Sequence, residues 1–571
     1  MSKREVKRNG RGQIISYEID GAFDSGVDSQ TYGEVLLDND DGNGHSKSLK
    51  QPISPFAIRT QFNNGRQPDS PTYDQFTDVE FSEEFINEVD FLKYKFKTKP
   101  YKHQYDAFLK SKDKKSYALF MEQGTGKSKV VIDNIAYLYR EGKINCAIIA
   151  APKGVYRNWI ASEFNTHMPD DVKSFTDICI WNPSETKTNI ETLTNFLNPS
   201  HKLKFFIINI EALSTDKGKN YLNRLLNITN CFWTIDESSN IKNRTARRTK
   251  SCLKLGKLAK YKRILTGTPV TQGPLDLWAQ MHFLDEFILQ ASFYAYRNTF
   301  CVMRRRRTST HSFDEIVEYQ RLDELQEILE EHSFRVTKEE CLDLPPKIRL
   351  KREIELTREQ KVMYHTLRKR AILELEQSKL VTAPLVITRI LRLQQILCGF
   401  IKYDDGTEEI IKGTNSRLQE LLDVLEETQG GVIIWATYRN SIKLIQETLS
   451  KKYGSSKVAS FFGDTPSEER QKIVERFQAG EIKYFVGQPR TGGYGLTLTA
   501  AKTVIYFNNT YDMEVRLQSE DRAHRIGQTD KVTYIDFVCP NTIDEKILQA
   551  LSTKKKLADQ ITGDEWKELF I

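Results

Sequence analysis

The chain has 571 residues, 39% of them hydrophobic and 28% charged, and its 84 basic and 77 acidic residues leave a net charge of +7. This length and apolar content exclude a single small binding module and predict two or three domains with buried cores. No run reaches ~18 uninterrupted apolar residues, and no apolar stretch follows the basic first residues, so we expect no membrane span and no secretory signal.

Cysteine spacing and charge clusters limit the chemistry further. The eight cysteines form no C-x-x-C pair, which argues against a disulfide framework and predicts no structural zinc. A mild basic excess permits a polyanionic partner without requiring one. Basic clusters at 304–307, 368–370 and 554–556 are each compatible with a solvated surface or with a phosphate contact.

The first part of the chain, residues 1–95, is rich in Gly, Asn, Asp and Ser and predicts an irregular, partly ordered extension. After this extension, the sequence pattern predicts a strand at 116–121, a helix at 128–142 and a strand at 145–151. Three more apolar runs predict buried parallel strands, at 204–209, 231–236 and 262–267.

A second series of short apolar runs lies nearer the C-terminus. These predicted strands are at 431–436, 457–462, 483–488, 503–507 and 532–538, with helices between them. The residues between the two series of strands have helical periodicity, with a break at 344–346. We therefore expect two α/β lobes, at 96–285 and 426–545, joined by helical insertions over 286–425 and followed by a C-terminal helix over 546–571.

The segment after the first predicted strand has the composition of a phosphate-binding loop. Gly124 and Gly126, on either side of Thr125, allow backbone amides to turn toward phosphate oxygens, and the following helix adds its positive end. Lys127 would reach the β and γ phosphates of ATP, and the Ser128 hydroxyl could bind Mg²⁺. The alternative is an ordinary glycine-rich turn, because the strict pattern has glycine where this chain has Met121.

Asp236 and Glu237 lie at the C-terminal end of the predicted strand 231–236, where open α/β sheets bind ligands. We expect Asp236 to hold Mg²⁺ through water and Glu237 to act as the base that orients the attacking water. Alone, the pair could equally cap a helix.

Arg522 and Arg525 lie three residues apart on a stretch that we expect to be helical, so they would share a face. Both could then stabilise charge on the γ phosphate across a cleft. The alternative is a surface helix with salt bridges to Glu520 and Asp521.

The order of these segments resembles the superfamily-two helicase fold and, within it, the Swi/Snf-type DNA translocases, from about residue 100 to about 561. The motifs that carry the resemblance lie at 100–104, 151–153 with Trp159, 210–213, 236–243, 265–278, 334–347, 462–464 with Arg470, 491–498 and 521–528. The last two are the most specific. The resemblance implies two tandem RecA-like lobes, with parallel sheets covered by helices on both faces.

The resemblance also implies roles for individual residues. It places Gln104 on adenine, and Gly495 and Gln518 at the nucleotide. It places five residues on DNA: Lys153, Lys242, Arg439, Thr491 and Gly492.

This chain departs from the family pattern at several positions. Ser239 stands where the family has His, Gln272-Gly273 replaces a Q-N pair, and Asn508-Asn509-Thr510-Tyr511 replaces a D-x-x-W-N-P turn. No catalytic group is lost, but these positions belong to the coupling between nucleotide and DNA.

Together these features predict a DNA-stimulated ATP hydrolase that uses ATP and Mg²⁺ and translocates on double-stranded or branched DNA. It would remodel protein–DNA complexes, forks or recombination intermediates. Two alternatives are a strand-separating DNA or RNA helicase and an ATP-binding DNA scaffold without turnover. We expect a monomeric motor in a bacterial or viral-host cytoplasm, with the nucleus left open.

Overall fold

The computed structural model describes residues 5–8, 14–18 and 88–562, apart from positions 154, 308–311, 343, 378–382, 404, 414, 493–495 and 526. The chain divides into two units, Met1–Glu80 and Phe81–Ile571. Within the first unit, β1 (Glu5–Arg8) and β2 (Ile14–Glu18) form an antiparallel hairpin. Most of the predicted irregular extension lies outside the described residues, and its last part includes α1 (Glu88–Tyr94).

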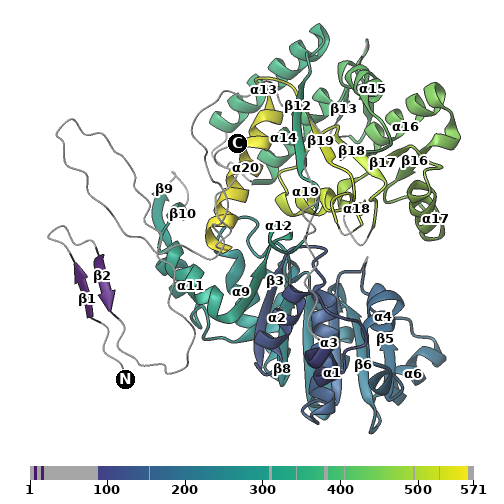
Figure 1. Ribbon diagram of the computed structural model, residues 1–571. Coiled ribbons are helices and arrows are strands. Elements are labelled where there is room, and N and C mark those ends of the chain that lie inside the picture. The colour runs from purple at the N-terminus through teal and green to yellow at the C-terminus, as the bar shows by residue number, and fades with distance from the viewer. Residues whose placement is uncertain are drawn as a thin grey trace, which may run out of the picture. The chain divides into compact units, whose positions relative to one another are not determined.

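The second unit contains two lobes, each built on a parallel sheet (Figure 1). The first sheet has the strand order β11-β3-β8-β7-β4-β6-β5. Its strands are β3 (Ser116–Met121), β4 (Cys146–Ala151), β5 (Thr176–Ile180), β6 (Leu203–Asn209), β7 (Cys231–Asp236), β8 (Tyr261–Leu265) and β11 (Ser333–Val336).

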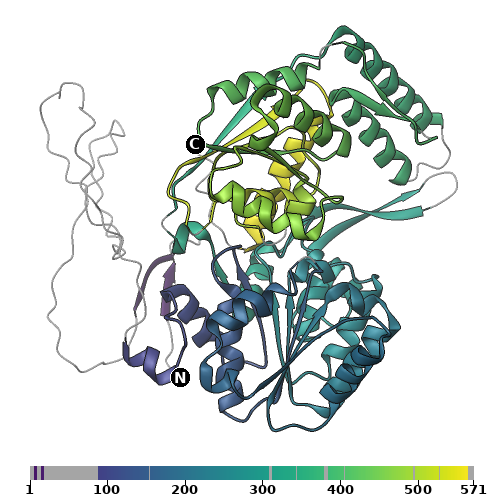
Figure 2. The same cartoon turned by 90° about the vertical axis from the view of Figure 1, so that its right-hand side faces the viewer.

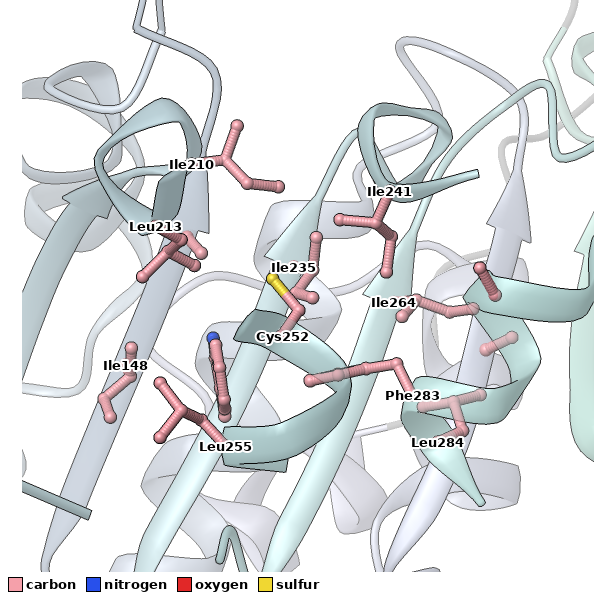
Figure 3. Packing of buried hydrophobic residues seen from close by; sticks show 14 of the residues in the cluster. Ile148, Ile210, Leu213, Ile235, Ile241, Cys252, Leu255, Ile264, Phe283 and Leu284 are labelled. Carbon is pink, nitrogen blue, oxygen red and sulfur yellow. The ribbon is translucent and has the colours of Figure 1, made fainter. Parts of the chain in front are cut away.

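Helices cover both faces of this sheet because side chains of a strand alternate between faces. Along β3, Leu119 packs toward α2 (Lys102–Ser111) and α3 (Lys127–Arg140), whereas Phe120 belongs to the core on the opposite face. That opposite core includes α7 (Asp216–Ile228), α8 (Arg247–Gly256) and α9 (Asp276–Leu284). Figure 3 shows part of this core, with Phe283 and Leu284 of α9 beside Ile264 of β8. Phe283 also packs edge-on against Trp233, with ring centroids 5.1 Å apart.

Short helical segments complete the first lobe. They are the π-helix Trp159–Phe164, α4 (Asn165–His167), α5 (Asp170–Lys173), α6 (Lys187–Leu197) and the 3₁₀ turns Ile210–Ser214 and Ser238–Ile241.

The second sheet has the order β12-β19-β18-β15-β17-β16, again all parallel. Its strands are β12 (Lys347–Glu353), β15 (Gly431–Trp435), β16 (Val458–Phe461), β17 (Tyr484–Gly487), β18 (Ala501–Tyr506) and β19 (Val532–Val538). Alternate residues of β15 again enter two separate cores. The prediction of two tandem RecA-like lobes is thus confirmed.

Helices and a 3₁₀ turn surround this sheet. They are α13 (Arg358–Gln377), α14 (Ala383–Leu397), α15 (Ser416–Glu427), α16 (Arg439–Tyr453), the 3₁₀ turn Ser455–Lys457, α17 (Ser467–Gln478), α18 (Pro489–Gly492) and α19 (Met513–Glu520).

Residues 286–425, expected to be helical, contain strands as well. α10 (Phe293–Phe300), α11 (Leu322–His332) and α12 (Lys338–Cys341) precede α13 to α15. However, β9 (Cys301–Arg307) and β10 (Ser312–Tyr319) form an antiparallel hairpin, and β13 (Phe400–Lys402) pairs with β14 (Glu408–Ile410). β11 and β12 each extend one sheet at its edge, because an edge strand offers unpaired backbone groups.

The last helix, α20 (Ile543–Thr562), packs against both lobes. Ile547 and Leu551 join the core of the first lobe, while the helix also contacts α14 and α19 of the second. Figure 1 shows this yellow helix running from beside α14 toward α11. Among the described residues, no helix combines the length and apolar character needed to cross a bilayer.

Candidate active site

The glycine-rich loop connects β3 to α3 and turns through two left-handed glycines. Gly124 and Gly126 have φ of 88° and 87°, and Gly126 is the residue before the first helical turn. A side chain at Gly126 would meet Gln104 Nε2 at 2.2 Å, so the loop and Gln104 are in close contact. Only glycine combines this backbone conformation with so little space.

Lys127 is buried at the start of α3 and points back over the loop. Its Nζ donates to the carbonyl oxygens of Met121 (2.9 Å) and Glu122 (3.1 Å). Burial lowers the pKa of Lys127, and the charges of Glu237 and Asp236 partly offset this effect. The ammonium group is therefore held by neutral acceptors with two carboxylates nearby.

Asp236 is the last residue of β7 and Glu237 follows it, and Gln123 of the glycine-rich loop donates to Glu237 Oε1 at 3.4 Å. Asp236 Oδ2 accepts from Trp159 Nε1 at 2.9 Å, and its Oδ1 accepts from the backbone N–H of Glu237 at 3.0 Å. Glu237 adopts a left-handed conformation with φ of 48°, which is rare for a residue other than glycine. Such strain occurs where surrounding structure enforces it, commonly at functional sites.

Burial and the neighbouring Asp236 raise the pKa of Glu237 to about 8. The charge of Lys127 and, more weakly, that of Arg522 oppose this rise. Burial also raises the pKa of Asp236, against the hydrogen bond from Trp159. A carboxyl group with a pKa near neutrality can exchange protons at physiological pH.

Arg522 and Arg525 come from the second lobe and lie beside this loop. Arg522 Nη1 and Arg525 Nη1 both donate to the Leu496 carbonyl oxygen, at 3.2 and 3.3 Å. A Cβ placed on Gly124 would be 3.7 Å from the Cβ of Arg525. The structure therefore brings both arginines and the glycine-rich loop into one site.

The expectation that these arginines lie on a helix is wrong. α19 ends at Glu520, and residues 521–525 form turns. The helix cannot continue because the carbonyl oxygen of Arg522 accepts from the backbone N–H of Leu498 instead of from a later helical residue. Glu520 and Asp521, the partners proposed for a surface helix, form ion pairs with other residues.

The phosphate and metal ligands expected from the sequence fit this geometry. The two left-handed glycines turn the loop so that its backbone amides can face a phosphate. Helix α3 begins directly after the loop and adds its positive N-terminus. Ser128 is the second residue of α3, and its hydroxyl interacts with Glu163, whose pKa is raised by burial and by Asp236. Ser128 and Asp236 would supply the oxygen ligands that Mg²⁺ prefers.

Gln104 and Thr125 support the loop from its side. Gln104 Nε2 donates to the Thr125 carbonyl oxygen at 3.2 Å, and the ring of His103 bonds to the same oxygen at 2.8 Å. Thr125 Oγ1 donates to the Glu122 carbonyl oxygen at 2.7 Å. In the second lobe, Gln518 donates to Glu514 at 3.2 Å, and Gly495 lies outside the described residues.

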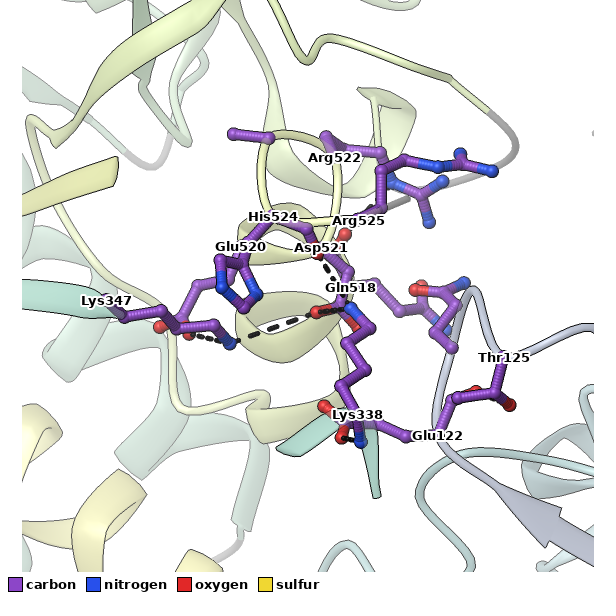
Figure 4. A network of polar contacts seen from close by, with 12 residues as sticks. Glu122, Thr125, Lys338, Lys347, Gln518, Glu520, Asp521, Arg522, His524 and Arg525 are labelled. Atoms are coloured by element: carbon purple, nitrogen blue, oxygen red, sulfur yellow. Dashed lines mark hydrogen bonds and ion pairs between the residues drawn. The ribbon is translucent and has the colours of Figure 1, made fainter. Parts of the chain in front are cut away.

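A lysine in the connection between the lobes, Lys338, links the two halves of the site (Figure 4). It is 2% exposed, and its Nζ donates to Asp521 Oδ1 at 2.6 Å and to the His524 carbonyl oxygen at 2.8 Å. Its backbone N–H donates to Glu122 Oε2 at 2.7 Å. One residue thus joins the glycine-rich loop to the arginine-bearing segment.

Neighbouring charges reinforce this link. Lys347 lies 3.5 Å from Glu520 Oε2, and Arg349 forms two bonds of 2.9 Å to the same carboxylate. Sequence reasoning assigned no role to Lys338 or Lys347, although both lie within the 334–347 motif. Their position in that motif is the feature of the sequence that could have indicated such a role.

The five residues expected on DNA all follow carboxyl ends of strands, two in the first lobe and three in the second. Lys153 is exposed after β4, whereas Lys242 lies after β7, where its Nζ bonds to Thr271 and lies 3.6 Å from Glu514. Arg439 begins α16 and pairs with Asp464 at 3.2 Å. Thr491 and Gly492 end α18, where the Thr491 hydroxyl donates to Gln488.

Ser239, one of the departures from the family pattern, also connects the lobes. Its hydroxyl donates to Glu514 Oε1 at 2.6 Å. Gly273, another departure, lies under the ring of Tyr319, where a Cβ would be 2.4 Å from the hydroxyl oxygen.

Two parallel-sheet lobes, a glycine-rich loop and arginines from the second lobe define a two-lobed, helicase-like phosphate-loop protein. The SNF2-related domain family matches residues 87–399, and the helicase conserved C-terminal domain family matches residues 413–527. The chain therefore belongs to the SNF2-related family.

Similar curated proteins carry related names. The "Putative ATP-dependent helicase/translocase YwqA" of Bacillus subtilis is 26% identical over 455 residues, 78% of this chain and 46% of that protein. An "Uncharacterized ATP-dependent helicase" of Mycoplasma pneumoniae is 27% identical over 442 residues, 77% of this chain and 39% of that protein. The chain thus spans less than half the length of these relatives.

Among solved structures, the "Sulfolobus solfataricus SWI2/SNF2 ATPase core in complex with dsDNA" matches 83% of this chain and 96% of that chain, with 22% identity and a TM-score of 0.37.

Substituting Lys338→Met should loosen the connection between the lobes, because the buried Asp521 would lose its nearest cation and keep only Lys347, 4.0 Å away. Such a loss costs about 3–5 kcal/mol. We expect a lower melting temperature and faster hydrogen exchange in residues 121–126 and 516–525. Lys361→Met, on the exposed face of α13, is the matched control. Equal exchange in both variants would show that Lys338 does not join the lobes.

Proposed function

We propose that this chain hydrolyses ATP, is stimulated by DNA, and translocates on double-stranded DNA to remodel bound proteins, forks or recombination intermediates. The observation that carries the proposal is the convergence of Lys127, Glu237 and Arg525 from two lobes around one glycine-rich loop. The names of similar proteins as ATP-dependent helicases or translocases support it.

In this mechanism the first lobe binds and activates the nucleotide. Loop amides and Lys127 hold the β and γ phosphates, and Gln104 lies close enough to the loop to read adenine. Mg²⁺, held by Ser128 and Asp236, would neutralise phosphate charge. Glu237 accepts a proton from the attacking water.

The second lobe completes the site. Arg522 and Arg525 stabilise the charge that develops on the γ phosphate. Because these arginines act only when the lobes meet, ATP binding favours closure and product release favours opening. DNA phosphates contacted by both lobes would then be moved in steps.

Substituting Lys127→Ala or Glu237→Gln should remove DNA-stimulated hydrolysis. We expect at least a ~100-fold loss in each variant, because one removes a phosphate-binding charge and the other the base. Glu327→Gln, an exposed carboxylate on α11, should match the wild type. Phosphate release at saturating ATP is the measurement, and undiminished turnover in either site variant would contradict the assignment.

The rate should also depend on pH through Glu237. Its carboxyl group has a pKa of about 8 and accepts a proton only when ionised, so kcat/KM should rise with pH toward a plateau above about 8. The residual rate of Glu237→Gln should lack this rise. A wild-type profile flat from pH 6 to 9 would exclude Glu237 as the base.

The activating polymer distinguishes the proposed track from its alternatives. ATP turnover measured side by side with duplex, single-stranded and forked DNA and with RNA should be highest with DNA that contains duplex. Stimulation by RNA alone, or unwinding of a tailed duplex, would favour a strand-separating helicase. DNA binding without turnover would favour a scaffold.

A further inference from the structure

The β9–β10 hairpin is exposed on both faces. Its register pairs Arg304 with Glu315, Arg305 with Asp314, Arg306 with Phe313 and Arg307 with Ser312. All four arginines are exposed, and Phe313 is 52% exposed. Figure 2 shows the hairpin as a teal ribbon running away from the first lobe. An uncovered two-stranded ribbon is only marginally stable in water, so a binding partner would stabilise it.

Among the described residues, two of the four arginines have no side-chain partner, because Arg305 donates to the Ser312 hydroxyl at 3.2 Å and Arg306 forms an ion pair. Glu315 forms an ion pair with Arg306, and Asp314 lies 3.7 Å from Arg297 of α10. Within the described part of the chain, no ion pair involves Arg304 or Arg307. Because strand side chains alternate, these two guanidinium groups lie on opposite faces of the ribbon.

The base of the hairpin lies at the edge of the first lobe where DNA contacts are proposed. Tyr319, the last residue of β10, covers Gly273 in the loop that follows β8. Gly273 is two residues from Thr271, whose hydroxyl accepts a hydrogen bond from Lys242 Nζ. The base of the hairpin therefore packs on the loop that binds a residue already expected on DNA.

We propose that the β9–β10 hairpin is a separate DNA-contacting arm, which binds the sugar-phosphate backbone of a duplex through Arg304 and Arg307. The proposal rests on the proposed function for the identity of the polymer. A two-stranded ribbon fits the major groove of B-DNA, where arginines on its opposite faces can reach the phosphates of both strands. Such contacts carry little sequence preference.

The test is the double variant R304A/R307A in the full chain, which leaves the Arg306–Glu315 pair intact. Fluorescence anisotropy with a labelled duplex, without ATP, gives the affinity over a series of salt concentrations. Each lost phosphate contact lowers the slope of log K against log salt by ~0.9, so we expect a decrease of ~1.8. Affinity at low salt should fall by about tenfold or more, with no change in the basal ATP turnover.

Two controls separate charge from folding. R224A/K254A removes two exposed positive charges from the C-terminal halves of α7 and α8, which lead into the amino ends of β7 and β8, and should keep the wild-type slope. R304K/R307K should restore most of the slope, because lysine still neutralises phosphate.

Each outcome decides the proposal. A wild-type slope and affinity in R304A/R307A would overturn it, while the ATP-hydrolase proposal would stand on the Lys127 and Glu237 variants. Loss of RNA binding with unchanged duplex binding would also overturn it. If no polymer stimulates turnover but the slope still falls by ~1.8, the hairpin proposal stands and the translocase proposal fails.

Discussion

The bond between Lys338 and Asp521 is the contact on which the composite site depends. A buried lysine is stable only when it is paired, and this one is paired across the lobes while its own backbone donates to Glu122 beside the glycine-rich loop. Because the connecting segment also supplies an edge strand to each sheet, the lobes are joined by hydrogen bonds as well as by covalent linkage. Arg525 lies beside Gly124 as a consequence.

Within the site, positive groups are bound mainly by neutral oxygens. Lys127 donates to two backbone carbonyls, and Arg525 donates to a third. Carbonyl acceptors satisfy a buried cation without neutralising its charge, so an anionic ligand would still be strongly attracted. Asp236 and Glu237 oppose this attraction, which makes their neutralisation by Mg²⁺ or by a proton part of the proposed mechanism.

The β9–β10 hairpin shows where sequence patterns fail to predict strands. Sequence patterns detect buried parallel strands as runs of apolar residues, as in the five strands of the second lobe that match predicted runs. Strand β9 reads C-V-M-R-R-R-R and has no such run over its length, because both of its faces meet solvent. The hairpin therefore escaped prediction, and the amphipathic helices on either side made the whole segment look helical. Gly273, noted only as a departure from the family pattern, is the residue that receives the hairpin's base.

The amino-acid sequence alone determined the two series of parallel strands, the glycine-rich loop, and the position of Asp236 and Glu237 after a strand. These features follow from local rules, since apolar runs form buried strands and glycines permit left-handed turns. Only the tertiary structure decided that Arg525 meets Gly124 and that Lys338 bridges Glu122 and Asp521. Those contacts join residues up to 401 positions apart in the chain, and their geometry depends on how two complete sheets pack, which no short window of sequence encodes.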